Sequence, residues 1–214
     1  MQILITKIIT FETIKMMSGK IKIWFTIVLI IVLIPMNLFA QEPNDIKYKF
    51  TQTDSSYTFY GSFKINANPK CLLEISFNYK HIRVLAPDAK EVQLISQGSN
   101  WNQISYTYQI FTFFKNKTVW HRILNEENQR VDFTLISSEN NLAIMPRMIS
   151  SSGYYQIKQQ GEYCIVEYYQ QCQLTDELIT KLYLNRAKKE AIKFMLKFFK
   201  YADTFCNSST SSNN

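Results

Sequence analysis

The stretch ELITKLYLNRAKKEAIKFMLKFFKYADTFC, residues 177–206, decides the fold. Its apolar positions recur every three or four residues, which places them along one stripe of an α-helix. They are Leu184, Ala187, Ala191, Phe194, Met195, Phe198, Ala202 and Phe205. Thr175 offers a capping side chain, and Asp176 and Glu177 place negative charge at the helix start. An amphipathic helix of about eight turns needs a wide apolar surface to lie on.

Most of the preceding sequence has the pattern of short antiparallel strands. Residues 57–65 alternate apolar and polar side chains, and Asn68-Pro69 then starts two short helices at 70–77 and 79–85. Six further strands are expected, at 91–96, 101–114, 118–124, 130–137, 153–159 and 162–174. The sequence therefore predicts one α+β domain, in which a seven-stranded antiparallel sheet grips a long C-terminal helix. The two short helices lie between strands 1 and 2.

Residues 1–40 have the features of a removable export signal. An apolar run at 23–34 is preceded by three lysines, Lys15, Lys20 and Lys22. Ala40 gives a small residue before Gln41, so we expect cleavage there and translation starting at Met16 or Met17. A membrane anchor is the alternative, but even counted to Met36 the run has at most 14 residues, where a membrane-spanning helix needs about 20.

The mature chain would then have three parts. A loose polar lead-in covers residues 41–56, the folded domain covers 57–206, and a tail at 207–214 made only of Asn, Ser and Thr is expected to be disordered. Removing four lysines and Glu12 from the 24 basic and 17 acidic residues leaves 20 and 16, a net charge of +4. This mild charge argues against a nucleic-acid partner. We expect a monomer.

Several segments across residues 57–201 follow the pattern of one known family. Ser152-Gly153-Tyr154-Tyr155, with Gly161 and Val166-Glu167-Tyr168, is similar to a glycine–aromatic strand and its partner. Further similarities cover residues 76–84, 106–122 and 178–187. Together they resemble the START-like superfamily, which includes polyketide cyclases, coenzyme Q-binding proteins and lipid carriers. The family's Gly-Pro turn before the last helix is replaced here by residues 172–176.

The resemblance implies a helix-grip fold, in which the sheet curves around the helix and leaves an apolar pocket between them. Strand parity and the helix stripe then give the side chains that would line the pocket. From the strands they are Phe59, Phe63, Tyr106, Tyr108, Phe133, Tyr155, Val166 and Tyr168; from the helix they are Leu184, Ala187, Ala191, Phe194, Met195 and Phe198. The small side chains of Ala187 and Ala191 would leave space, and tyrosine hydroxyls would add polar contacts. The alternative is that the same side chains form a solid core.

His121 and Arg122 are adjacent on an expected strand, so one side chain points to the cavity and the other away from it. Parity alone does not say which. Arg122 could hold a ligand carboxylate or phosphate, or it could pair with Glu126 or Asp132. His81 is expected at the surface. The sequence has no Ser-His-Asp order, glycine-rich phosphate loop or CxxC spacing, so no catalytic residue, metal or cofactor is assigned.

Four cysteines follow the expected cleavage site. Cys164 and Cys172 are eight residues apart on one strand, about 26 Å if extended, and so cannot bond each other. In the helix-grip fold Cys71, Cys164 and Cys206 would meet near one rim. A disulfide between Cys71 and Cys206 would then tie down the end of the long helix. Four buried free thiols are the alternative.

These observations favour an exported, periplasmic or secreted, non-enzymatic binder or carrier of a hydrophobic or lipid-like small molecule. The alternatives are a cyclase- or hydrolase-type enzyme using the same cavity, and a solid-core interaction or stress protein. A pocket of several hundred Å³ with Arg122 or His121 would favour the enzyme, an apolar pocket the carrier, and a filled core the third. A second face of the long helix carries Lys189, Lys193, Lys197 and Lys200. This face could contact an anionic membrane transiently, or it could simply be exposed to water.

Overall fold

The computed structural model describes residues 46–86, 88–110, 114–141, 146–175 and 180–208. The expected export signal and the expected acidic helix start at Asp176 and Glu177 lie outside these residues. Within the described ranges, no helix combines the length and the hydrophobicity needed to cross a membrane.

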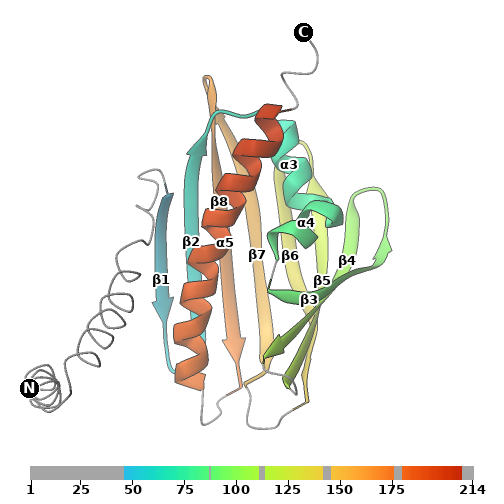
Figure 1. The fold of residues 1–214 in the computed structure, drawn as a ribbon, viewed down its shortest axis with the longest axis vertical. Helices are drawn as coiled ribbons and strands as arrows, with labels where there is room; N and C mark the ends of the chain where they lie inside the picture. The colour runs from blue at the N-terminus through green and yellow to red at the C-terminus, as the bar shows by residue number, and fades with distance from the viewer. Residues whose placement is uncertain (1–45, 87, 111–113, 142–145, 176–179, 209–214) are drawn as a thin grey trace, which may run out of the picture. The chain divides into compact units, whose positions relative to one another are not determined.

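One antiparallel sheet of eight strands organises the described residues, in the order β1-β2-β8-β7-β6-β5-β4-β3 (Figure 1). The pairing of β2 with β8 joins the first two strands to a run of six strands in which each pairs with its neighbour in sequence. The strands are β1 (Ile46–Gln52), β2 (Ser56–Ile65), β3 (Ala89–Gln97), β4 (Trp101–Ile110), β5 (Phe114–Asn125), β6 (Arg130–Asn140), β7 (Met148–Gln160) and β8 (Tyr163–Leu174).

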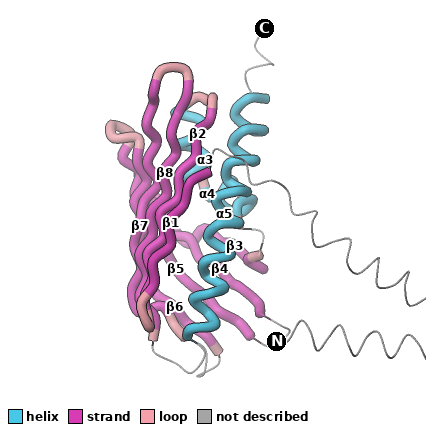
Figure 2. Tube along the Cα trace, turned by 90° about the vertical axis from the view of Figure 1, so that its left-hand side faces the viewer, coloured by secondary structure: helices cyan, strands magenta, loops and turns pink. Residues whose placement is uncertain are grey.

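In the described part of the chain, three helices lie on one side of the sheet, which curves around the longest of them (Figure 2). They are α3 (Pro69–Phe77), α4 (Tyr79–Leu85) and α5 (Thr180–Ser208). The side chain of Asn68 accepts a hydrogen bond from the Lys70 amide, and Asn78 caps α4 in the same way through the Lys80 amide. Asx capping followed by Pro69 therefore starts the first short helix where the sequence indicates.

The prediction of seven strands is wrong by one, because β1 lies inside the predicted loose lead-in at 41–56. Its backbone pairs along the edge of β2, from Ile46 opposite Phe63 to Gln52 opposite Tyr57. Most of its side chains are exposed, so main-chain pairing rather than apolar burial defines it. The two short helices accordingly follow the second strand. At the other end, α5 includes residues 207 and 208 of the predicted tail, and 209–214 lie outside the described residues.

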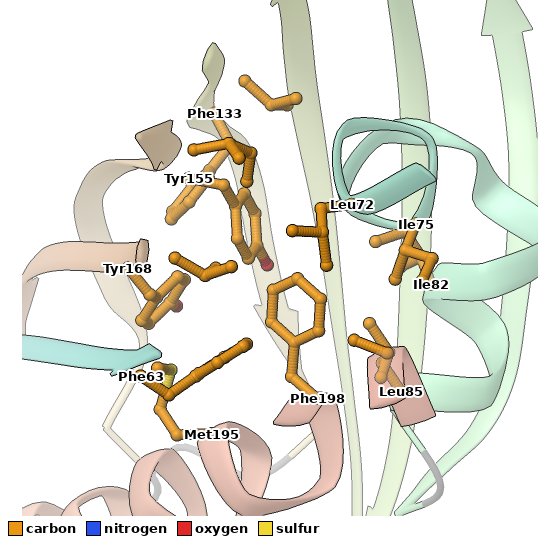
Figure 3. Packing of buried hydrophobic residues seen from close by; sticks show 14 of the residues in the cluster. Phe63, Leu72, Ile75, Ile82, Leu85, Phe133, Tyr155, Tyr168, Met195 and Phe198 are labelled. Carbon is orange, nitrogen blue, oxygen red and sulfur yellow. The ribbon is translucent and has the colours of Figure 1, made fainter. Parts of the chain in front are cut away.

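Phe198 of α5 stands at the centre of the packed core, pointing toward Tyr155 of the sheet (Figure 3). Its ring lies 5.4 Å from that of Phe63 and 5.9 Å from that of Tyr155, both edge-on. Edge-to-face contacts at this range stabilise aromatic clusters beyond the burial of area alone. Gly61 brings α5 close to β2, since a Cβ there would lie 2.9 Å from Met195 Cγ.

The C-terminal end of α5 is fastened to the two short helices. Cys71 of α3 and Cys206 of α5 form a disulfide, as expected, while Cys164 and Cys172 are free and buried. Beside it, His81 is hydrogen-bonded through Nδ1 to the Tyr201 hydroxyl at 2.8 Å and packs edge-on against Phe205. The expectation of a surface position for His81 is wrong, because α4 turns this side chain into the contact with α5 and leaves it 9% exposed.

Candidate functional site

A cavity of about 310 Å³ lies between the sheet, α4 and the first half of α5. This volume is at the lower end of the range for small-molecule sites, about 300–1,000 Å³. The sheet contributes Tyr57, Tyr106, Tyr108, Gln109, Asn116, Thr118, Trp120, Arg122, Phe133, Met148, Tyr155, Tyr168 and Gln170. The helical side contributes Ile82, Leu85, Ala86, Asp88, Tyr183, Arg186, Ala187, Glu190, Ala191, Lys193, Phe194 and Lys197.

The predicted lining residues divide into two groups. Those that line the cavity are Tyr106, Tyr108, Arg122, Phe133, Tyr155, Tyr168, Ala187, Ala191 and Phe194. Those that instead fill the adjacent core, each less than 2% exposed, are Phe59, Phe63, Val166, Leu184, Met195 and Phe198. The division arises because one apolar stripe of α5 meets both the packed core and the cavity, and periodicity does not distinguish the two.

Several lining residues were not predicted from the sequence. On β5, Asn116, Thr118 and Trp120 share the cavity face with Arg122 at every second position. That spacing is readable in the sequence once Arg122 is known to point inward. Tyr57 shares one face of β2 with Phe59 and Phe63, and Tyr183 lies one helical turn before Ala187, so both positions also had a signal in the sequence.

Aromatic rings form much of the wall. The ring of Tyr168 stacks against Phe133 at 5.7 Å and lies 5.0 Å from Tyr155. Tyr106 and Tyr108 are nearly parallel, with centroids 6.3 Å apart. On the opposite side, Ala187 and Ala191 are half-buried and one helical turn apart. Their small side chains leave space between α5 and the sheet.

Burial makes the tyrosine hydroxyls of the cavity wall harder to ionise. Burial raises the pKa of Tyr108, Tyr155 and Tyr168, and it raises the pKa of Tyr183 to about 12. For Tyr155 the charge of Arg122 acts in the opposite direction without overcoming burial. At neutral pH these groups can donate hydrogen bonds and are weak proton acceptors.

Arg122 is the residue that points inward, and it is only 2% exposed. Its Nη1 donates to the carbonyl oxygen of Phe77 at 2.8 Å, and its Nη2 donates to the carbonyl oxygen of Ser76. The alternative of an ion pair with Glu126 or Asp132 is wrong, since Asp132 accepts from Arg130 instead, at 2.7 and 2.9 Å.

The other member of the adjacent pair, His121, lies off the cavity. It is half-buried, and its ring centroid is 5.7 Å from that of Trp101. Of the two adjacent side chains, Arg122 is therefore the one that faces the cavity. The sheet register gives the reason, because Arg122 faces Phe133 of β6 across the strands, and Phe133 also lines the cavity.

Charged side chains surround the cavity where it meets solvent. Lys193 Nζ lies 2.7 Å from Asp88 Oδ2, across the gap between α5 and the segment after α4. The hydrogen bond from Lys193 lowers the pKa of Asp88 below its usual range. Burial lowers the pKa of Lys197, which is half-buried at this rim. Two of the four lysines suggested for membrane contact thus belong to the cavity rim.

The sheet also contributes uncharged polar side chains to the cavity, namely Gln109, Asn116, Thr118 and Gln170. Asn116 is 8% exposed, and its Oδ1 is buried without a hydrogen-bond partner among the described residues. Trp120 Nε1 donates to Thr118 Oγ1 at 3.0 Å, so this neighbouring pair is internally satisfied. No group of three or more His, Cys, Asp or Glu side chains suited to a metal ion occurs within the ranges that the structure describes.

The fold is similar to that of several solved structures. No protein-family model matches the sequence, and no curated protein matches it. Among solved structures, the chain is similar to the STAR-related lipid transfer protein from Xanthomonas axonopodis, with a TM-score of 0.53 and 12% identity over 78% of this chain and 97% of that one.

Two further similarities point to the same fold. The di-domain ARO/CYC StfQ from the steffimycin biosynthetic pathway gives a TM-score of 0.55 at 7% identity, over 74% of this chain and 53% of that one. The major latex-like protein 151 from Panax ginseng gives 0.50 at 12% identity, over 71% and 98%. Identities this low are evidence for the fold and not for the activity. The described domain shares the fold of these structures, the expected helix-grip arrangement of an antiparallel sheet curved around a long C-terminal helix.

Proposed function

We propose that this protein is an exported, non-enzymatic binder or carrier of a hydrophobic small molecule, held between the sheet and α5. The observation that carries the proposal is the cavity of about 310 Å³ with aromatic walls, in which polar side chains are interspersed and charged ones lie at the rim. An apolar cavity with a small number of placed polar side chains is the usual form of a small-molecule site. The similar solved structures include one named as a lipid transfer protein, which is consistent with this function.

A cyclase-type enzyme is the second candidate, because the cavity contains Arg122 and one similar structure is named an ARO/CYC protein. Arg122 is permanently charged and cannot itself exchange a proton at ordinary pH. Its titratable neighbours in the cavity, Tyr106 and Tyr155, have pKa values raised by burial. General acid–base chemistry works best with a group whose pKa lies near the working pH, which favours the carrier.

Export is part of the proposal and rests on the N-terminal sequence alone. The lysines, the apolar run and Ala40 support removal of residues 1–40 and release of a chain beginning at Gln41. N-terminal analysis of protein recovered from outside the cytoplasm should find Gln41 first. Intact chain in the membrane fraction would contradict this part and leave the binding part standing.

The binding function is tested with a neutral fluorescent probe, N-phenyl-1-naphthylamine, and the folded chain from Gln41 onward. We expect saturable binding of one probe per domain and displacement by 1-decanol. Native mass spectrometry of protein purified from its own host should show a co-purifying small molecule. Absence of saturable probe binding would favour a solid interaction domain, and conversion of a recovered ligand on incubation would favour the enzyme.

A further inference from the structure

In the part of the chain that the structure describes, the buried charge of Arg122 has no acidic partner. The ion pairs among the described residues join Glu74, Asp88, Asp132, Glu167 and Glu190 to other cations and leave Arg122 out. A cation removed from water without a counter-ion is costly unless other groups stabilise it. The structure therefore has to show what stabilises this guanidinium.

Part of the stabilisation comes from the end of α3. Ser76 and Phe77 are the last two residues of that helix, and their carbonyl oxygens accept from Arg122. The last carbonyls of a helix have no partner within the helix and carry roughly half a negative charge together. Arg122 thus caps α3, but the cap neutralises only about half of its charge.

The rest of the guanidinium is available to the cavity. A guanidinium has five N–H donors, and two bonds to the helix end leave about three of them. Arg122 lines the cavity together with Tyr155, whose ring centroid is 5.9 Å from the guanidinium carbon. Neutral tyrosines beside it can donate to an anion but cannot replace one.

We propose that the bound molecule is an amphipathic carboxylic acid whose carboxylate enters the cavity first and pairs with Arg122. This assignment rests on the proposed binding function and adds the chemical class and the orientation of the ligand. A carboxylate matches the planar fork of a guanidinium. A single negative charge also fits a single, partly neutralised cation, whereas a phosphate carries about −1.5 to −2 at neutral pH.

The cavity volume limits the size of the ligand. At about 30 Å³ for a water-sized group, about 310 Å³ accommodates about ten such groups. Decanoate, 1-decanol, decylamine and decyl phosphate are therefore suitable probes, because they share one chain and differ in the head group.

Isothermal titration calorimetry of the folded domain with these four ligands tests the proposal. The wild-type protein should bind decanoate most tightly and decylamine least tightly. In Arg122→Met the preference for decanoate over decanol should fall about 10- to 100-fold, the range for a charged hydrogen bond, with decanol binding nearly unchanged. Arg130→Met, which removes an arginine of β6 paired with Asp132, is the matched control and should keep the preference.

The outcomes separate this inference from the proposed function. Loss of decanol binding in the wild type would overturn the proposed function, whereas equal binding of decanol and decanoate would overturn only the carboxylate assignment. Tighter binding of decyl phosphate than of decanoate, or loss of the preference in Lys197→Met instead, would place a different anion or a different anchor at the site. If Arg122→Met does not fold, the order of ligand affinities in the wild type still tests the proposal. Arg122→Lys then serves as the second variant and should retain part of the preference for decanoate.

Discussion

Replacing Ala191 with leucine should fill part of the cavity and leave the domain folded. Ala191 is half-buried on α5 and lines the cavity. Leucine adds three carbons, each about the size of a water molecule at about 30 Å³, so about 90 Å³ of the cavity would be occupied. The variant therefore removes roughly a third of the space available to a ligand.

The effect on stability follows from the same geometry. Burying three carbon groups contributes at most about 2.4 kcal/mol, and fixing the leucine rotamer costs about 0.5–1 kcal/mol. The free energy of unfolding should therefore stay level or rise by up to about 1.5–2 kcal/mol, and Tm should rise by a few degrees. Filling a void gains contacts that the wild-type side chain lacks.

Ala202→Leu provides the matched control, since it adds the same atoms to the same helix. Ala202 is fully buried and does not line the cavity, so overpacking should cost about 1–3 kcal/mol. Thermal melting and titration with the neutral probe are measured for both variants. If Ala191→Leu loses as much stability as Ala202→Leu while probe binding stays at the wild-type level, the space beside Ala191 is already filled and the reasoning fails.

Three further predictions concern other parts of the domain. Gly153→Ala should lower the free energy of unfolding by at least about 1–3 kcal/mol and weaken probe binding, because its Cβ would overlap the backbone oxygen of Tyr169 and lie 2.5 Å from Phe133 Cζ; an unchanged melt would contradict this. Replacing both Cys71 and Cys206 with serine should reduce stability in urea by up to about 5 kcal/mol, the chain-entropy value for a separation of 135 residues; equal midpoints with the wild type would exclude a contribution from the disulfide. Burial raises the pKa of Tyr183 to about 12, so this tyrosine favours the folded state fully below pH 10, and that contribution is lost as the pH rises toward 12. Absorbance at 295 nm should show the cavity tyrosines ionising together with alkaline unfolding, and their titration near pH 10 in folded protein would be evidence against their burial.

The short helices and the long helix were predictable from the sequence because local physics determines them. Asn68 and Asn78 cap α3 and α4, and the stripe on α5 needs only its own periodicity. β1 was missed for the opposite reason, since an edge strand depends on main-chain pairing with β2. The strands expected at 130–137 and 153–159 are longer in the structure, because pairing extends β6 to Asn140 and starts β7 at Met148.

The cavity could be predicted in part. Aromatic side chains at strand and helix spacing identified one face correctly, but the same spacing describes Phe63 in the core and Phe133 at the cavity. Whether a side chain enters the core or the cavity depends on the curvature of the sheet and on the distance between the sheet and α5. The direction of Arg122 needed the register between β5 and β6, and the burial of His81 needed the contact of α4 with α5.

The disulfide and the His81–Tyr201 hydrogen bond both fasten the same end of α5. The cavity borders the other half of the helix, from Tyr183 to Lys197, where small side chains and one exposed ion pair to Asp88 meet the neighbouring segments. The crosslink therefore fixes where α5 starts to run along the sheet, and the placement of the cavity wall at Tyr183, Ala187 and Ala191 depends on an anchor at the far end of the same helix.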